Sequence, residues 1–393
     1  MKIFNTLYIF ILCFTLTSSK GQTTETPQQA SKNVIVGGGC DGCELMFIDM
    51  PEIIKSVDTS AGWLEKGKKL LITGKVYHID GKTPASNVII YYWQTDDKGY
   101  YSPKPNMNKE AKRHGHIRGW VKTNATGQYS IYTIRPAPYP NSDMPAHIHP
   151  SIKEADIANE YYIDEFVFDD DKLLTGKKRK ALENRGGSGV LRLVNSDGIS
   201  VAEHNIILGL NIPNYPKKRA KTLSGLEIGE DNPSFIPFHA WGPDKGSRAC
   251  PVCKYGRYHG IVYFVGNNPD WNDIKNWLKY LETESLKRKK YLKAYFVYGN
   301  EKDYTKQKRQ SELEQIGKEL GLKNIALTYV PSMKDAETEV NLNKINPSVK
   351  NTFIIYRHRN IIDKYVNLDA NPSNFRTISK VLDQTVSKFF QFD

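Results

Sequence analysis

The feature that most constrains the fold is a series of β-rich segments between Lys69 and Ile212, separated by turns and not by helical periods. The segments are bounded by Asp-Gly, Asn-Ala-Thr-Gly and Gly-Gly turns, and they are LLITGKVYHIDG, NVIIYYWQTDD, GWVKTNATGQYSIYTI, YYIDEFVFDDD and VAEHNIILGLNI. Strands at short spacing without helices between them predict an antiparallel β-sandwich. We place this domain at residues 68–216.

The chain changes character after residues 217–232, a charged, glycine-containing segment that we interpret as a linker. Buried-type strands such as GIVYFVG and YLKAYFVYG then alternate with helical periods. The first of these helices has an aspartate near its start and four apolar residues on one face, Ile274, Trp277, Leu278 and Leu281. A hairpin and a closing helix follow. This order predicts a three-layer α/β domain over residues 233–393.

The N-terminus, MKIFNTLYIFILCFTLTSSKGQ, has a lysine, an apolar run and then small and polar residues. That pattern predicts a signal peptide over residues 1–21, and hence an exported protein located in the periplasm or outside the cell. Residues 22–67 form a polar lead that carries the first cysteine pair and a short helix expected around Pro51–Glu65. No later segment is apolar and long enough to span a bilayer.

The formal net charge is +12, from 55 Lys and Arg against 43 Asp and Glu. The basic residues are scattered, with short clusters such as GKKRK and LKRKK, and no nucleic-acid-binding motif accompanies them. We therefore interpret the charge as solvated faces and expect no nucleic-acid partner.

Four cysteines remain after the signal peptide, in two pairs with the same spacing: Cys40 with Cys43 and Cys250 with Cys253. In an oxidising compartment such pairs become disulfides. A zinc site shared by both pairs is disfavoured because about 200 residues separate them, against the usual 15–20.

The Cys250-Pro-Val-Cys253 pair has the spacing of thioredoxin-type redox centres. It precedes the first buried strand, however, where a redox pair would follow that strand. We therefore favour a structural or auxiliary disulfide over a catalytic dithiol. The cationic neighbours Lys254, Arg257 and His259 keep the redox alternative open.

The segment RPAPYPNSDMPAHIHP, residues 135–150, carries a candidate metal site. On a strand His147 and His149 point to the same face and can reach one ion. For this pair alone, a metal site and an ordinary polar strand face are equally favoured. Tyr139 supplies a phenolate, a hard anionic ligand suited to Fe3+. A zinc or copper site would need a further ligand, for which only His114 and His116 lie close in sequence.

These segments resemble the intradiol ring-cleaving dioxygenases, the protocatechuate and catechol dioxygenase family. The resemblance covers GKVYHIDGKTPASNVIIYYWQTDDKGYY, RGWVKTNATGQYSIYTIRPAPYP and PAHIHP, in the family's order. It implies an Fe3+ ion held by Tyr101, Tyr139, His147 and His149. A slip of one residue would exchange Tyr101 for Tyr100, and the spacing from Trp93 favours Tyr101.

Two departures concern the substrate more than the metal. Met144 stands where the family often has an arginine that assists the bound substrate, and the spacer from Tyr139 to His147 is shorter than in the protocatechuate enzymes. In the loosely similar segment YYIDEFVFDDD, Glu165 falls where a glutamine beside the metal ligands is expected. A solvent-facing carboxylate on a strand is the alternative for Glu165.

The resemblance implies a dioxygenase that cleaves a catechol with O2 to a muconate-type diacid. Tyr139 would leave the iron and take a proton, while Tyr101 stays bound. The partners would be a small aromatic diol and O2, with a homo-oligomer possible. The C-terminal domain has a thioredoxin-like element order, and INPSVKNTFIIY resembles the proline-before-strand segment of that fold. Two alternatives are a non-catalytic extracellular binding module and a thiol–disulfide oxidoreductase acting through Cys250 and Cys253.

Overall fold

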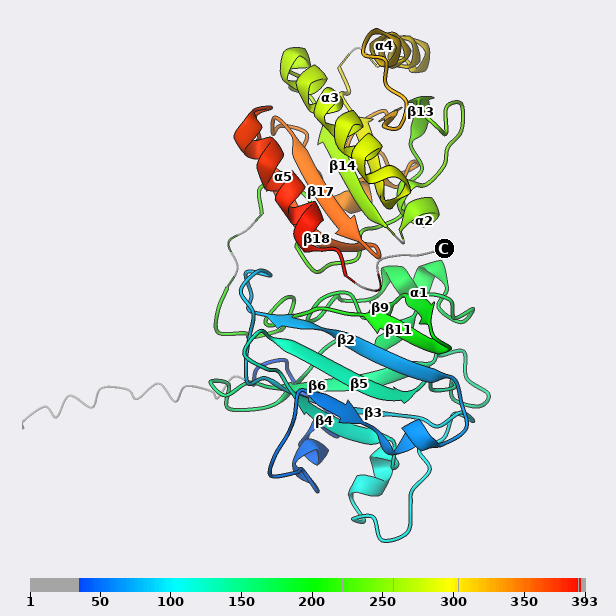
Figure 1. Cartoon of the computed structure of the whole chain (residues 1–393), viewed down its shortest axis with the longest axis vertical. Helices are drawn as coiled ribbons and strands as arrows, with labels where there is room; N and C mark the ends of the chain where they lie inside the picture. The colour runs from blue at the N-terminus through cyan, green and yellow to red at the C-terminus, as the bar shows by residue number, and fades with distance from the viewer. Residues whose placement is uncertain are drawn as a thin grey trace, which may run out of the picture. The chain divides into compact units, whose positions relative to one another are not determined.

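The computed structural model describes residues 35–218, 220, 222–256, 258–302, 304–387 and 389 (Figure 1). The expected signal peptide, the polar lead up to residue 34 and Arg257 lie outside the described residues. Within these ranges, no helix combines the length and the apolar character that a membrane crossing requires.

Two six-stranded sheets make up the N-terminal half. The first sheet has the order β1-β5-β2-β11-β10, with β12 beside β2. Its strands are β1 (Val57–Thr59), β2 (Lys69–Tyr77), β5 (Gln128–Ile134), β10 (Leu193–Ser196), β11 (Ile199–Glu203) and β12 (Ile206–Ile207). The second sheet has the order β4-β3-β6-β8-β9, with β7 beside β6. Its strands are β3 (Ile89–Gln94), β4 (Arg118–Lys122), β6 (His147–Lys153), β7 (Tyr161–Tyr162), β8 (Phe166–Phe168) and β9 (Val190–Leu191).

Alternation along the strands decides which side chains lie between the sheets. In β3, Ile90 and Tyr92 are fully buried and share one apolar cluster with Ile72 of β2 and Ile131 of β5. Tyr91 and its neighbour Trp93 point to the other side, because successive strand residues face opposite ways. The second sheet therefore has an inner face in the core and an outer face, which carries its own aromatic cluster.

The expectation of purely antiparallel sheets is wrong in part. β1 pairs parallel with β5, β2 pairs parallel with β11, and β8 pairs parallel with β9. The strands of each pair are far apart in sequence, so no tight hairpin has to join them. The sequence shows the hairpins through their turns but gives no sign of such long-range neighbours.

The helix expected around Pro51–Glu65 is also not formed. That stretch contains β1 and a single 3-10 turn, η2 (Ala61–Leu64). Pairing with β5 takes the backbone of β1 into the sheet, so tertiary contact overrides local preference here. Between residues 35 and 218, three other short helices are formed: η1 (Cys43–Phe47), η3 (Ala111–His114) and α1 (Gly176–Lys180).

A third sheet, of order β13-β16-β15-β14-β17-β18, forms the C-terminal half. Its strands are β13 (Phe238–Trp241), β14 (His259–Val265), β15 (Leu292–Tyr298), β16 (Ala326–Tyr329), β17 (Thr352–Arg357) and β18 (Asn360–Val366). Its helices are α2 (Pro251–Tyr255), η4 (Lys289–Tyr291), η5 (Val340–Asn343) and the three long ones α3 (Trp271–Arg288), α4 (Lys306–Glu319) and α5 (Pro372–Gln384). The expected order of strands and helices after residue 259 is confirmed.

Helix α3 forms as its sequence predicts. The Asp270 side chain accepts hydrogen bonds from the backbone N–H groups of Asn272 and Asp273, which caps the helix. Its four predicted core residues, at positions 274, 277, 278 and 281, are all buried.

The three-layer expectation needs a correction, because all three long helices share one apolar cluster and hence one face of the sheet. β14, β15 and β16 follow one another across the sheet in a single direction, and right-handed crossovers then place α3 and α4 on the same side. Irregular segments and α2 cover the other face, with Leu226, Phe235 and Val252 in its cluster. Leu226 belongs to the segment interpreted as a linker, which therefore packs on this sheet.

Candidate metal centre

Strand β6 presents the two histidines of the His-Ile-His motif on the outer face of the second sheet. Ile148 between them is fully buried in the core, so His147 and His149 point the other way. β6 pairs with β3 so that Trp93 stands opposite His149. The Trp93 and His149 rings stack with centroids 4.8 Å apart. The strand register thus fixes both the direction and the ring plane of His149.

The two tyrosines reach the same place from loops that dock on each other. Tyr101 follows a turn at Asp96–Gly99, and Tyr139 lies in the segment after β5. Gly99 has a φ of 89°, and a Cβ there would lie 2.2 Å from the Pro138 carbonyl oxygen. Only glycine permits this close approach. Because Gly99 has no side chain, the loop that carries Tyr101 can pack against the loop that carries Tyr139.

Four donor atoms converge as a result. Tyr101 Oη lies 2.6 Å from Tyr139 Oη and 2.9 Å from His149 Nε2. Tyr139 Oη lies 3.1 Å from His147 Nε2 and 3.4 Å from His149 Nε2. The two Nε2 atoms are 3.1 Å apart. Two phenols and two imidazoles, from two loops and one strand, therefore face a single point.

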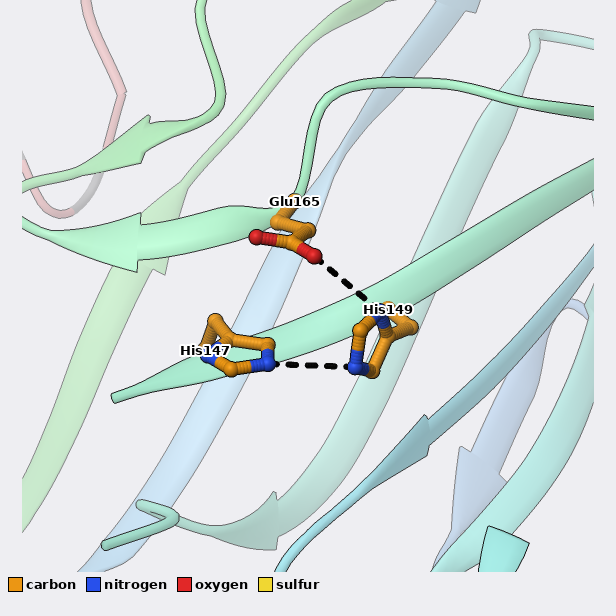
Figure 2. A group of neighbouring side chains, drawn as sticks. All are labelled: His147, His149 and Glu165. Atoms are coloured by element: carbon orange, nitrogen blue, oxygen red, sulfur yellow. Dashed lines mark hydrogen bonds and ion pairs between the residues drawn. The ribbon is translucent and has the colours of Figure 1, made fainter. Parts of the chain in front are cut away.

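The opposite ring nitrogens are held by acceptors. His147 Nδ1 lies 2.7 Å from the Pro145 carbonyl oxygen, which can only accept a hydrogen bond. His149 Nδ1 lies 3.3 Å from Glu165 Oε1 (Figure 2). Both Nδ1 atoms must then carry hydrogen, which leaves the Nε2 lone pairs directed at the other donors. Two lone pairs 3.1 Å apart repel unless a proton or a cation lies between them.

Burial acts on the protonation of these groups. It raises the pKa of Tyr101, and the hydrogen bond to Tyr139 raises it further. It also raises the pKa of Tyr139. The pKa of His149 falls well below its usual value because of burial and the neighbouring His147. The imidazole of His149 is thus neutral, and the phenols ionise only where a cation offsets their charge.

This donor set fits one hard cation. Two atoms that each lie about 2.1 Å from an ion, at angles of about 90° to 110°, are about 3.0 to 3.4 Å apart, close to the separations found here. A second set, the ligand atoms of His147, His149 and Glu165, lies within 4.8 Å. Glu165 contacts Nδ1 of His149, away from the four converging atoms, so it orients the histidine instead of completing the ligand set.

Most other candidate residues from the sequence lie outside the donor set. Tyr100 is 55% exposed, so Tyr101 is the tyrosine that enters the cluster. Met144 is 43% exposed. His114 Nδ1 contacts the Tyr91 hydroxyl, and His116 Nε2 contacts Glu65. Cys40 and Cys43 lie at the N-terminal edge of this region, whereas Cys250 and Cys253 belong to the C-terminal half.

Sequence reasoning missed the contacts that three residues make at the site. Trp93 stacks on His149, and His114 stacks on Trp93 with centroids 4.0 Å apart. Asp171 accepts a hydrogen bond from the backbone N–H of Ala146, one residue before the histidine pair. Alternation in β3 could have placed Trp93 on the outer face, but nothing local connects Asp171 with the site.

Comparison with known proteins shows which proteins the region around the candidate metal centre is similar to. Residues 47–186 match the model of the dioxygenase family described as "Dioxygenase". The protocatechuate 3,4-dioxygenase beta chain of Burkholderia cepacia is 32% identical over 92 residues. That alignment covers 22% of this chain and 39% of the relative, so the chain spans well under half of that protein's length. These matches support a relationship of residues 47–186 to the intradiol dioxygenases.

Solved structures give weaker likenesses. The dioxygenase domain of a carbohydrate-binding fusion protein from Streptomyces sp. SirexAA-E has 18% identity and a TM-score of 0.30, over 39% of this chain and 87% of that one. Catechol 1,2-dioxygenase from Acinetobacter sp. ADP1 has 20% identity and a TM-score of 0.31, over 44% of this chain and 64% of that one. The relationship therefore rests on the family match and the Burkholderia relative.

Proposed function

We propose that the protein is an Fe3+-dependent intradiol dioxygenase that cleaves a catechol with O2 to a muconate-type diacid. The observation that carries this proposal is the convergence of Tyr101, Tyr139, His147 and His149, in the region related to the intradiol dioxygenases. Both phenol oxygens and both Nε2 atoms would hold the ion. A ferric ion held there would supply Lewis-acid chemistry that activates a catechol toward O2.

The chain's own residues supply orientation and proton transfer. His147 and His149 are fixed in ring plane and tautomer by Pro145 and by Glu165. Of the two phenols, Tyr139 contacts three of the converging donor atoms and Tyr101 two. Tyr139 would accept a catechol proton at its Oη, and Tyr101 would remain a ligand. Both atoms of O2 enter the product, so no external reductant is required.

We propose further that the protein is exported and that the signal peptide over residues 1–21 is removed. The apolar run behind Lys2 and the two cysteine pairs support this. Mass spectrometry of the protein recovered outside the cytoplasm tests it: a mature chain that begins near Gly21 is expected, and retention of the intact N-terminus in the cytoplasm would contradict it.

The test of the main proposal is a visible absorption spectrum of the purified protein with its iron quantified, before and after catechol is added without oxygen. Ferric tyrosinate gives a broad charge-transfer band that shifts when a catechol binds. Admission of O2 should then consume one O2 per catechol and yield the diacid. A protein that stays colourless after Fe3+ loading would refute the proposal and favour the non-catalytic binding module.

A second candidate function is thiol–disulfide exchange at Cys250 and Cys253. Cys253 is exposed, and the Ser234 hydroxyl lies 3.2 Å from its sulfur. An attacking thiolate of a partner dithiol could reach it and take the disulfide in exchange for two electrons. Equilibration with glutathione redox buffers tests this, since a structural disulfide stays oxidised in buffers that reduce a catalytic one. Whether the C-terminal half is thioredoxin-like stays a prediction.

A further inference from the structure

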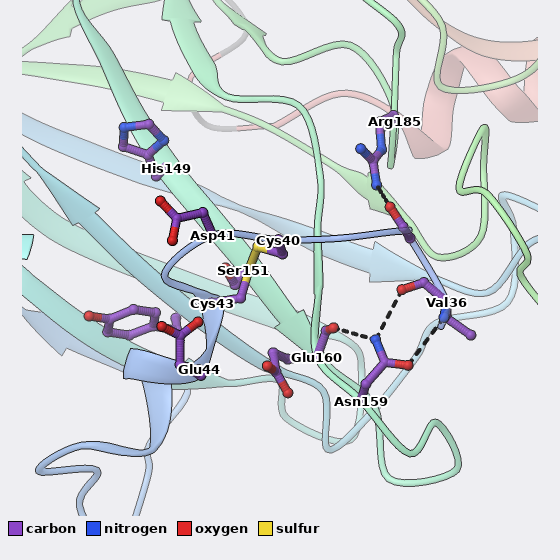
Figure 3. Close-up of a disulfide and its surroundings, with 12 residues drawn as sticks. Val36, Cys40, Asp41, Cys43, Glu44, His149, Ser151, Asn159, Glu160 and Arg185 are labelled. Carbon is purple, nitrogen blue, oxygen red and sulfur yellow. Dashed lines mark hydrogen bonds between the residues drawn. A yellow bond between two sulfur atoms is a disulfide. The ribbon is translucent and has the colours of Figure 1, made fainter. Parts of the chain in front are cut away.

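The Cys40–Cys43 disulfide lies on the outer face of the second sheet, beside the candidate metal centre (Figure 3). Cys43 is fully buried, and its sulfur lies 2.9 Å from the Ser151 hydroxyl. A disulfide sulfur has no hydrogen, so Ser151 donates. Ser151 is two residues beyond His149 on β6 and shares its face. The disulfide is therefore fixed to the strand that carries the histidines.

Contacts on both sides hold this loop in place. Before it, the Val36 backbone exchanges hydrogen bonds with the Asn159 side chain. After it, η1 packs on the outer face, where the Trp120 indole donates to the Met46 carbonyl at 2.7 Å. Between the cysteines Gly42 has a φ of 86°, and a Cβ there would lie 2.7 Å from His114 Nε2. A residue with a side chain would lift the loop off the sheet.

The loop borders an open pocket of about 330 Å3 next to the candidate metal centre. Gly39, Cys40 and Asp41 of the loop line it together with Trp93, His149 and Tyr162. His149 belongs both to the cavity wall and to the four converging donors. The volume suits a single aromatic ring with a substituent.

One guanidinium and two carboxylates form a charged cluster beside this cavity. Arg113 also lines the cavity and pairs with Asp41 at 3.0 Å and with Glu44 at 3.8 Å. The arginine is 54% exposed and Asp41 is 91% exposed, so water screens the pair and a ligand can displace it. Asp41 is the acidic side chain among the residues that line the cavity, and Glu44 beside Arg113 adds a second carboxylate to this cluster. A ligand that displaces Arg113 therefore meets the Asp41 carboxylate.

We propose that the Cys40–Cys43 loop is the outer wall of the substrate pocket and determines specificity. It places Asp41 where a carboxylate on the catechol ring is repelled and a neutral or cationic substituent is accepted. This inference rests on the proposed dioxygenase function and specifies the substrate class of that site. The disulfide acts as a positioning element, because it holds Asp41 over the cavity without contacting the donor atoms.

The first test compares two double variants, Cys40→Ser/Cys43→Ser and, as the matched control, Cys250→Ser/Cys253→Ser. Anaerobic titration of the ferric band with 4-methylcatechol gives Kd, and oxygen uptake gives kcat and KM. The loop variant should bind iron as the unmodified protein does but show about ten-fold higher Kd and KM. The control should match the unmodified protein. Unchanged Kd and KM, or loss of iron from the loop variant, would overturn the inference.

The second test keeps the disulfide and changes only charge, which decides the matter if the double variant fails to fold. Asp41→Asn should raise kcat/KM for 3,4-dihydroxybenzoate relative to 4-methylcatechol about three-fold at low ionic strength, as expected for two charges about 7 Å apart in water. The gain should shrink in 0.5 M salt, a concentration at which the screening length is about 4 Å.

The control for charge is Asp197→Asn, in an exposed turn between β10 and β11 with a φ of 51° that asparagine tolerates. It should leave the substrate ratio unchanged. An Asp41→Asn ratio equal to that of the control would overturn the inference. If the unmodified protein binds no iron, it is the proposed function that fails, and the ferric band reports that before any variant is compared.

Discussion

The two C-x-x-C loops have the same spacing, and each closes a disulfide, yet their surroundings differ. Cys43 is fully buried against Ser151 on the strand of the metal centre. Cys253 is exposed in the middle of a five-residue helix in the other half of the chain, and Cys250 caps the start of that helix. Equal spacing therefore does not imply an equal role. We therefore propose different roles for the two loops: the first as the wall of a substrate pocket, and the second as a disulfide whose sulfur a partner can reach.

The largest expected effect comes from His149→Ala. It tests whether the candidate metal centre beside the Cys40–Cys43 loop is catalytic. His149→Ala removes an imidazole that contacts both phenols and lines the cavity. We expect at least a roughly 1000-fold loss of kcat/KM with catechol, together with loss of bound iron. Steady-state oxygen uptake and iron analysis measure this. Substantial activity in the variant would mean that no catalytic metal lies beside the Cys40–Cys43 loop. The proposed difference between the two loops would then be wrong.

A smaller effect is expected from Glu165, whose carboxylate holds His149 from outside the donor set. Glu165→Leu should weaken iron binding about 10-fold to 100-fold, since partners that orient a metal ligand contribute about that much. Glu165→Gln, which keeps an acceptor oxygen, should recover most of the affinity. Competition with a chelator measures the constants. Equal affinities for Leu and Gln would mean that the contact does not orient the histidine.

The two disulfides should also differ in reactivity. Because Cys253 is exposed and Cys43 is buried, a small thiol should reduce the Cys250–Cys253 bond about ten-fold faster than the Cys40–Cys43 bond. Timed reduction, alkylation and peptide mass spectrometry measure both rates in the same sample. Faster reduction of Cys40–Cys43 would show that the first loop opens readily and would weaken its assignment as a pocket wall.

The last prediction concerns how the free energy of unfolding depends on pH through His114, which lies beneath the Cys40–Cys43 loop. Burial, with Arg118 and Arg113 nearby, lowers the pKa of His114 to about 3. The unfolded chain binds a proton near pH 6.5 and the folded one does not, so this group makes stability fall as pH drops from 6.5 toward 3. His114→Phe keeps a ring against Trp93 and should reduce that slope by about 1.4 kcal/mol per pH unit.

Urea unfolding at pH 7, 6 and 5 measures the slope. A variant of the corresponding histidine near the second loop, His259→Phe, is the comparison, because burial also lowers the pKa of His259 to about 3. Similar reductions for both variants are expected. An unchanged slope for His114→Phe alone would mean that the first loop admits water to this histidine.

Much of the fold and of the candidate site could be predicted from local patterns. Period-two runs and their turns located most strands, and the apolar period with an aspartate cap located α3. The helix expected around Pro51–Glu65 is not formed because β1 in that stretch pairs with β5 in a sheet. The placement of α3 and α4 on one face followed from strand order, which no local pattern specifies.

The sequence by itself determined the chemical types of the donors and the strand direction of His147 and His149, because alternation along a strand is a local property. It also determined that the cysteines occur in two equal pairs. Only the tertiary structure decided how closely Tyr101 approaches Tyr139, and that Glu165 contacts Nδ1 of His149. It alone placed Cys40–Cys43 over a cavity. These are contacts between segments distant in sequence, set by the packing of loops on sheets, and local spacing carries no record of them.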